Sequence, residues 1–343
     1  MGAQAHAQSS SIVSQSGDNN GAEVEQVGDN TSTIEQVNNV PAVLGQRAIV
    51  FQRGLDGNVA DIVQDAAGSN SASAIQSGQN SFATISQIGS SINSSAVIGQ
   101  GPLTDSNVGI VTQTGDPVTA STLGNVASIA QSAGADGNGS NNFAEILQGD
   151  TTRAAFPGTV TGGFGNQTNA VQAGDNNFLE TVQGGANFFA FISQLGSANI
   201  HSSAQGDLGG SSGFLTLFQE GARNTSFVGQ SSTSSQATIN QVGEDNQSGV
   251  DQGLVGLTAT GGDRNFASVN QTGNNNESNI LQNSNLAGGD NLSIVTQIND
   301  DNLSVITQDG SSSLATVSQA DGSASFVTQG GTNNTATVIQ GTP

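Results

Sequence analysis

The chain has 343 residues, and its five arginines, with no lysine, stand against 27 acidic residues, which gives a formal net charge of −22 at pH 7. A charge of this sign and size argues against nucleic acid or an anionic membrane surface as a partner. Cysteine is absent and the only histidines are His6 and His201, which excludes disulfide bonds and thiol chemistry. No nucleophilic triad or paired-carboxylate pattern emerges, so we expect neither an enzyme nor a cofactor.

One pattern of about eleven residues, roughly N-x-A-x-I-x-Q-x-G, recurs along almost the whole chain. Its register is set by 26 glutamines, and 16 of the 25 gaps between them are ten to twelve residues long. Ile, Val or Leu stands two residues before the glutamine in 22 repeats, a small residue four before it in 23, and Asn or Ser six before it in 23. A fixed period of this kind indicates a repeat architecture.

The regular positions are two residues apart, which predicts that each repeat is a β-strand. Side chains separated by two residues share one face of a strand, while the residues between them point to the other face. The face with Asn, Ala, Ile or Val, and Gln is nearly constant and its alternate face varies, so we expect the constant face to be buried. Gly-, Asp- and Asn-rich segments after the glutamines, such as 15–20 and 172–177, favour tight turns.

In chain order, a short N-terminal segment, 1–8, precedes one repeat domain, 9–343. Two strands with their turns make about 22 residues, which is one rung of a solenoid. We therefore predict an all-β solenoid of about 13 two-strand rungs, stacked in parallel as in amyloid. No stretch is apolar and long enough for a signal sequence or a membrane span, and we expect no membrane insertion.

Nine gaps between glutamines are longer than twelve residues, and seven of them follow odd-numbered strands. All odd-to-even turns of a two-strand rung lie on one edge, so we expect the insertions to gather there. The longest gap contains a stretch that could pass for a degenerate strand with Gly162 in the glutamine position, but we interpret it as a loop. The predicted loop insertions are 37–45, 101–107, 114–124, 132–141, 149–166, 206–212, 253–264 and 283–290.

Polar residues on the buried face require partners, because a lone buried amide is costly. Stacked rungs place the same amide above and below, so each can donate to one neighbour and accept from the other. We expect this core ladder to include Asn20, Ala22, Val24, Gln26, Asn30, Ile34, Gln36, Asn177, Gln183, Ile192, Gln194, Asn246, Gln241, Ile306, Gln308, Val317 and Gln319.

The spacings resemble the curlin repeat, S-x5-Q-x-G-x2-N-x-A-x3-Q, of the curli fibre subunits that bacteria export. The stretches 19–37, 166–199 and 312–340 carry the motif, and the resemblance covers nearly the whole chain from Ser9. Familiar curli subunits have fewer and more regular repeats. Their glycine-rich leader is here reduced to the segment before Ser9.

The resemblance implies a secreted, extracellular subunit that polymerises end to end into amyloid-like fibres of a biofilm matrix and mediates adhesion. It also implies a nucleator subunit and an outer-membrane secretion channel as partners. Independently of the family, the first and last rungs of a solenoid expose unpaired strand edges that can template another chain. We expect the joint between subunits to include Val13, Gln15, Val327, Gln329, Asn334, Ala336, Val338 and Gln340.

Two other functions remain open for the same fold. A monomeric repeat adhesin would keep the solenoid without polymerising. An ice-binding solenoid would need a regular outward array, usually of threonine; Thr33 and Thr84 fit such an array, but Glu23, Asp61 and Phe191 interrupt it.

Two candidate sites have a structural and a functional interpretation. His201 occupies an inward position where small residues dominate, which favours a tolerated substitution over a pH or metal switch. Acidic turns at 261–265, 288–291 and 299–302 faintly resemble the calcium-binding repeats of β-rolls. They are scattered rather than consecutive, so we favour solvated turn carboxylates and expect no metal site.

Overall fold

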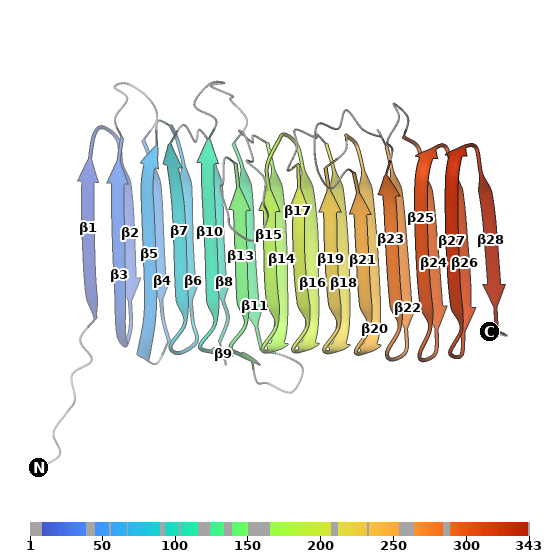
Figure 1. Ribbon diagram of the computed structural model, residues 1–343. Helices are drawn as coiled ribbons and strands as arrows, with labels where there is room; N and C mark the ends of the chain where they lie inside the picture. Colours follow the sequence, from blue (N-terminus) through green and yellow to red (C-terminus); the bar gives the residue numbers. More distant parts are fainter. Residues whose placement is uncertain are drawn as a thin grey trace, which may run out of the picture.

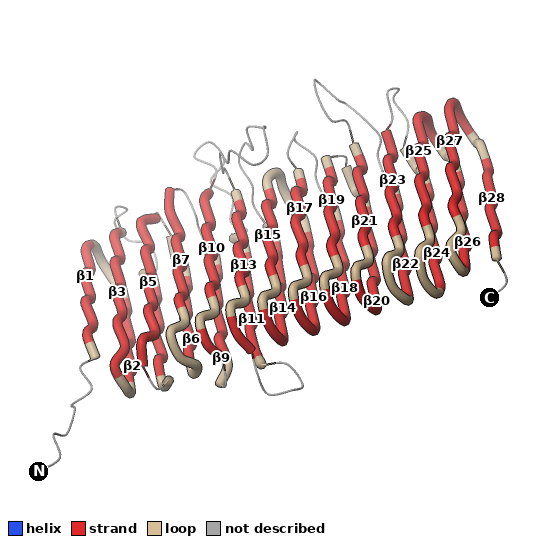
Figure 2. The backbone as a smooth tube through the Cα atoms, turned by 60° about the horizontal axis from the view of Figure 1, so that its bottom comes forward, coloured by secondary structure: helices blue, strands red, loops and turns tan. Residues whose placement is uncertain are grey.

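The computed structural model describes residues 9–38, 45–54, 56–66, 68–89, 93–102, 104–115, 124–133, 139–149, 165–206, 212–231, 233–253, 264–283 and 289–341. Every regular element in these ranges is a β-strand. The strands form an elongated solenoid of two facing layers (Figures 1 and 2). The predicted all-β solenoid is therefore confirmed. The predicted N-terminal segment 1–8 lies outside the described residues.

Two sheets of 13 strands contain all 26 glutamine repeats, so the solenoid has one strand of each sheet per rung. Sheet 1 consists of β1 (Ser10–Ser16), β3 (Asp29–Val37), β5 (Asp56–Ala66), β7 (Phe82–Gly89), β10 (Val108–Gly115), β13 (Phe143–Gln148), β15 (Phe178–Gln183), β17 (Ile200–Gln205), β19 (Thr225–Gln230), β21 (Gln247–Gln252), β23 (Glu277–Asn283), β25 (Leu303–Ser311) and β27 (Ala324–Thr332). Sheet 2 consists of β2 (Gly21–Gln26), β4 (Arg47–Gln52), β6 (Ser71–Gln76), β8 (Ser95–Gln100), β11 (Val126–Ser132), β14 (Gln167–Asp175), β16 (Phe189–Ser197), β18 (Phe214–Ala222), β20 (Gln236–Glu244), β22 (Phe266–Thr272), β24 (Leu292–Ile298), β26 (Leu314–Ala320) and β28 (Thr335–Gln340).

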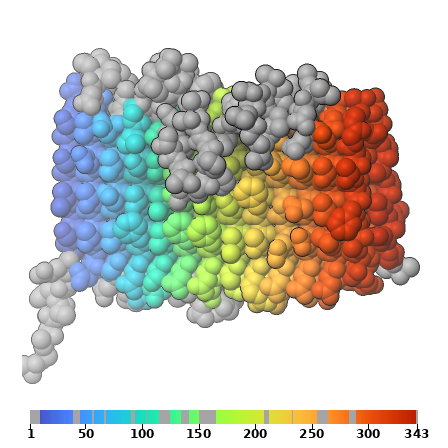
Figure 3. Space-filling view, viewed as in Figure 1, coloured from blue at the N-terminus to red at the C-terminus, as the bar shows by residue number. Residues whose placement is uncertain are grey.

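Neighbouring strands of each sheet run parallel and keep the glutamines in register. Gln219 of β18, for example, pairs with Gln241 of β20, which pairs with Gln271 of β22. The chain therefore alternates between the sheets and adds one strand to each sheet per rung. Figure 3 shows the rungs as adjoining bands from one end of the molecule to the other.

Burial follows the two-residue period that the sequence predicts. In β4, the side chains of Ala48, Val50 and Gln52 are fully buried, while the residues between them are at least partly exposed. The core is a thin layer because small residues and a single row of Ile, Val or Leu separate the two sheets.

Where the repeat departs from its pattern, a large inward side chain is accompanied by a small one in the same strand or in the next rung. In β15 and β17 the large residue moves to the position four before the glutamine, Leu179 and His201, and a small polar residue takes the next inward place. Phe188 replaces the usual asparagine and is fully buried, because Gly213 of the following rung leaves room for its ring. A Cβ on Gly213 would lie only 2.5 Å from that ring.

Most turns from sheet 2 back to sheet 1 are short and lie along the lower edge in Figure 1. They contain a residue in the left-handed region just before the asparagine that recurs in the repeats. Asn176, with φ of 55°, is an example. Gly174 also has a positive φ, of 103°, and a Cβ there would lie 2.1 Å from the carbonyl oxygen of Gly196. Glycine is thus required by both the conformation and the close stacking of these turns.

Seven of the nine long gaps follow a strand of sheet 1 and two, after Gln100 and Gln131, follow a strand of sheet 2. These two insertions contain β9 (Thr104–Asp105) and β12 (Gly139–Ser140), which pair as a separate two-stranded sheet, so the loops predicted at 101–107 and 132–141 each contain a short strand. Strands also continue into the predicted loops at Val37, Thr114, Gly115, Ser132 and Asn283.

Large parts of the predicted insertions lie outside the described residues: 39–44, 103, 116–123, 134–138, 150–164, 207–211, 254–263 and 284–288. The position of Gly162 is among them. Among the described strands, β13 in sheet 1 is followed by β14 in sheet 2, and β14 pairs directly with β11 of the preceding rung.

Candidate functional site

A continuous ladder of glutamine amides runs through each sheet. In every step, Nε2 of one glutamine donates to Oε1 of the glutamine one rung later in the chain, over 2.6–3.1 Å. The direction of donation never reverses. Each ladder is therefore polar along the solenoid axis.

The same glutamines also connect the two sheets. Nε2 of Gln241 donates to the carbonyl oxygen of Thr225 in the facing sheet over 3.1 Å, in addition to its bond to Gln271. Gln219 repeats the arrangement with the carbonyl oxygen of Ile200 at 3.2 Å. Both amide protons and the amide oxygen are thus used, which offsets the desolvation cost of a fully buried side chain.

The asparagines that stand six residues before the glutamines form hydrogen bonds in a different pattern from the simple side-chain ladder that the sequence predicts. Oδ1 of Asn224 accepts from both the backbone N–H and Nδ2 of Asn246, each at 3.1 Å. Nδ2 of Asn246 also donates to the carbonyl oxygen of Gly273 over 2.7 Å. Asparagine therefore closes the turn and joins it to the next one, a role that side-chain periodicity does not reveal.

The predicted ladder and joint residues all lie on ladder strands or directly before one. The fully or almost fully buried ones are Asn30, Ile34, Gln36, Asn177, Gln183, Ile192, Gln194, Asn246, Gln241, Ile306, Gln308, Val317, Gln319, Val327 and Gln329. Those half-buried in the two terminal rungs are Asn20, Ala22, Val24, Gln26, Asn334, Ala336, Val338 and Gln340, while Val13 and Gln15 of β1 are exposed.

The two ends of the solenoid differ in the hydrogen-bonding groups that they present. At the N-terminal end, Oε1 of Gln15 and of Gln26 accept no hydrogen bond from the described residues. At the C-terminal end, Nε2 of Gln340 has no acceptor within the described part of the chain, and Nε2 of Gln329 donates only to the carbonyl oxygen of Leu314. One end therefore offers amide acceptors and the other offers amide donors.

The ends also differ in charge. Strands β27 and β28, with the turn between them, contain no charged residue, whereas Asp18, Glu23 and Glu25 lie in the first rung. Glu25 is paired with Arg53 at 2.6 Å. The N-terminal end is thus acidic and the C-terminal end neutral.

Exposed apolar side chains mark both ends on the outward face. Phe326 and Ile339 are 71% and 74% exposed, and Ile12 is 62% exposed. Periodicity does not single out these residues, because the outward face varies from repeat to repeat. The available signal was that large apolar residues occupy outward positions in both the first and the last rung.

His201 is fully buried in the core. Its Nδ1 lies 2.7 Å from Oγ of Ser226, while Nε2 has no hydrogen-bond partner within the described structure. Burial lowers the pKa of the imidazole to about 3, so the ring is neutral at physiological pH. The described residues contain no cluster of three or more His, Cys, Asp or Glu that could hold a metal ion.

We expect acid to destabilise the solenoid through His201. The imidazole binds a proton in the unfolded chain below a pH of about 6.5 but in the folded chain only below about 3. Between these values, each pH unit of acidification costs about 1.4 kcal/mol of folding free energy. Chemical denaturation from pH 7 to pH 4 measures the loss in the soluble chain and in His201→Ser. The loss should be smaller in the variant; equal losses would contradict this role.

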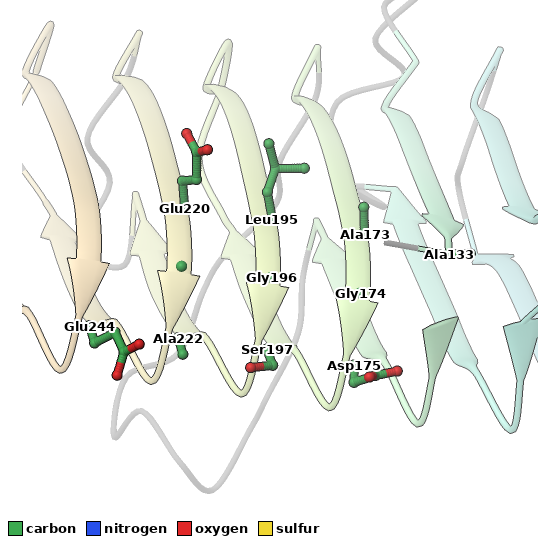
Figure 4. A pocket seen from close by; sticks show the side chains of 11 residues that line it. Ala133, Ala173, Gly174, Asp175, Leu195, Gly196, Ser197, Glu220, Ala222 and Glu244 are labelled. Carbon is green, nitrogen blue, oxygen red and sulfur yellow. The ribbon is translucent and has the colours of Figure 1, made fainter. Parts of the chain in front are cut away.

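The acidic turns form cross-rung contacts. Asp290 pairs with Arg264 at 2.8 Å, and Asp300 accepts from the backbone N–H of Asn274 at 2.7 Å. Residues 261–263 lie outside the described residues. Where β14, β16, β18 and β20 end, an open groove of about 680 Å³ runs over the glycine turns, and Asp175, Glu220 and Glu244 lie along it (Figure 4).

The outward rows do not form a regular array. On sheet 2, Thr216 and Thr238 lie side by side in register, but Phe191 precedes them and Ser268 follows them in the same row.

No family model matches this chain, and no curated protein matches it. Within the described ranges, no helix is long and apolar enough to cross a membrane.

Proposed function

We propose that this chain is a structural subunit of an extracellular bacterial fibre, similar to curli, that assembles end to end in a biofilm matrix and mediates adhesion. The observation that carries the proposal is the match between the two ends. Donor amides lie at one end and acceptor amides at the other, so a second copy extends both ladders without changing their direction. The curlin-like spacing of the repeats supports the same function.

The joint follows from continuing the observed register by one rung. Gln329 and Gln340 then lie opposite Gln15 and Gln26 of the next subunit, and Val327 and Val338 lie opposite Val13 and Val24. Each glutamine of the last rung would donate to a glutamine of the first, as it does between rungs within the chain. Stacking would also bury side chains that are half-exposed or exposed in the isolated chain.

The outward residues favour the same head-to-tail order. Phe326 would pack against Ile12 of the next subunit, which reduces the exposure of two apolar side chains to water. Two N-terminal ends would instead bring together the carboxylates of Glu23 and Glu25. Two C-terminal ends would set amide donors against amide donors, so neither symmetric joint satisfies the ladders.

The partners implied by the curlin resemblance belong to the proposal as well. They are further copies of this chain, a nucleator subunit and an outer-membrane secretion channel, with an extracellular location. The net charge of −22 gives no support for nucleic acid as a partner.

The proposal is tested by incubating the purified chain at neutral pH. Electron microscopy should show unbranched fibres within hours to days, and fibre diffraction should give a reflection near 4.8 Å, about the interstrand spacing. Persistent monomers without that reflection would favour the monomeric adhesin and contradict polymerisation.

A charge series at the joint tests its register. Thr337 would lie opposite Glu23 of the next subunit, so we expect Thr337→Lys to speed seeded elongation and Thr337→Glu to slow it at low salt. An exposed ion pair contributes about 0.2–1 kcal/mol, so the rates should change by a factor of roughly 1.4 to 5. In a Glu23→Lys background the order of the two variants should reverse. An unchanged order there would show that the two positions do not meet.

A further inference from the structure

A pocket of about 380 Å³ lies on the outer face of sheet 1 and reaches β25, the last strand but one of that sheet. It extends over β19, β21, β23 and β25. The outward side chains that line it include Phe227, Asp251, Asn279, Leu281 and Val305. Its volume is within the range of small-molecule sites, about 300–1,000 Å³.

The pocket lies over one outward glycine, Gly249, and a second outward glycine, Gly229, lies next to the lining residue Asp251. Across the strands, Gly249 lies between Phe227 and Asn279, and Gly229 lies beside Asp251. Neither glycine has a positive φ, so the backbone conformation would admit other residues. Asn279 leans over Gly249, since a Cβ there would lie 2.4 Å from its Oδ1. The Asn279 side chain thus takes up the space over Gly249, and the lining of the hollow includes the apolar side chains of Phe227, Leu281 and Val305.

Asp251 is the only charged residue among the described residues that line this hollow. Its carboxylate is half-buried and makes no hydrogen bond or ion pair with the described residues. Burial raises the pKa of this carboxyl to about 6, so it remains ionised at neutral pH at a cost in desolvation. Two other outward residues of the four strands are charged. Glu277 is the first residue of β23, at the end away from the pocket's Leu281, and Asp309 follows Gln308 of β25. The surroundings are therefore acidic.

We propose that this pocket binds a small organic cation in which a primary ammonium group is attached to an aromatic or branched alkyl body. The ammonium group would pair with the Asp251 carboxylate, which has no partner among the described residues. The apolar body would lie against Phe227, Leu281 and Val305, where it displaces water from apolar surface. This site does not depend on fibre formation, because all of its residues lie within one chain.

Calorimetric titration of the soluble chain with 2-phenylethylammonium tests the site, and neutral 2-phenylethanol serves as the matched probe. At pH 7.5 we expect one saturable site for the ammonium compound and binding at least about tenfold weaker for the alcohol. Affinity should fall as the pH is lowered through about 6, because protonation removes the carboxylate charge.

Two variants complete the test. Asp251→Asn keeps the shape of the side chain and should lose the preference for the ammonium compound, and its circular dichroism should match that of the original chain. Glu277→Gln removes a carboxylate from the same face outside the pocket and should bind as before. Equal binding of the two probes, unchanged binding by Asp251→Asn, equal loss in both variants, or no saturable binding at millimolar concentration would each overturn the proposal.

Discussion

Replacing Gln340 by Glu is expected to stop fibre elongation while leaving the isolated solenoid folded. Gln340 is only half-buried in the last rung, where its Oε1 accepts from Nε2 of Gln319 at 3.1 Å, and a carboxylate can accept that bond equally well. In the fibre, however, the new oxygen would replace the donor to Gln26 of the next subunit. Two acceptors and an unpaired charge would then be buried at the joint, at a cost of about 3–5 kcal/mol.

Seeded growth followed by light scattering or dye fluorescence measures this effect, and Thr335→Glu is the matched control. Thr335 lies on the outward face of the same strand and would lie opposite Gly21 of the next subunit, so its charge stays in water. Growth of Gln340→Glu should return when the pH is lowered to about 4 or below, where the carboxyl group is protonated and can donate. Equal slowing by both substitutions would show that the inward and outward faces of β28 are wrongly assigned.

Replacing Gln241 by Glu is expected to destabilise the solenoid itself. The amide of Gln241 is fully buried and donates to Oε1 of Gln271 at 2.9 Å and to the carbonyl oxygen of Thr225 at 3.1 Å. A carboxylate oxygen in that place would face two acceptors without a counter-ion. We expect a loss of about 3–5 kcal/mol in the free energy of unfolding at neutral pH.

Guanidinium unfolding of the soluble chain measures this loss. Thr238→Glu is the control, because Thr238 lies on the outward face of the same strand, and its effect should stay within about 0.5 kcal/mol. The loss in Gln241→Glu should shrink as the pH falls toward the pKa of the new carboxyl group. A loss as large in Thr238→Glu would contradict the burial of the glutamine ladder.

The strands and their buried faces could be predicted from sequence because both depend on local spacing. Alternate residues of a strand necessarily point to opposite faces, so one regular face, repeated 26 times, predicts which side chains are inside. The same pattern predicts two facing sheets, because an apolar face with Ala48 and Val50 must pack against the face of another sheet. The glutamine ladder was predictable because stacked copies of one amide satisfy one another.

Only the tertiary structure decided how neighbouring rungs adjust to one another. The common direction of all hydrogen bonds between glutamine side chains, the use of asparagine oxygens by the next backbone N–H, and the fit of Phe188 over Gly213 join residues 20 or more positions apart. The pairing of β9 with β12 and the hollow beside Asp251 likewise arise from residues on different strands. Periodicity reports the environment of one strand at a time. These features depend on which residues of the adjacent rung lie in register with a given residue. Only the stacking of the folded chain determines this register.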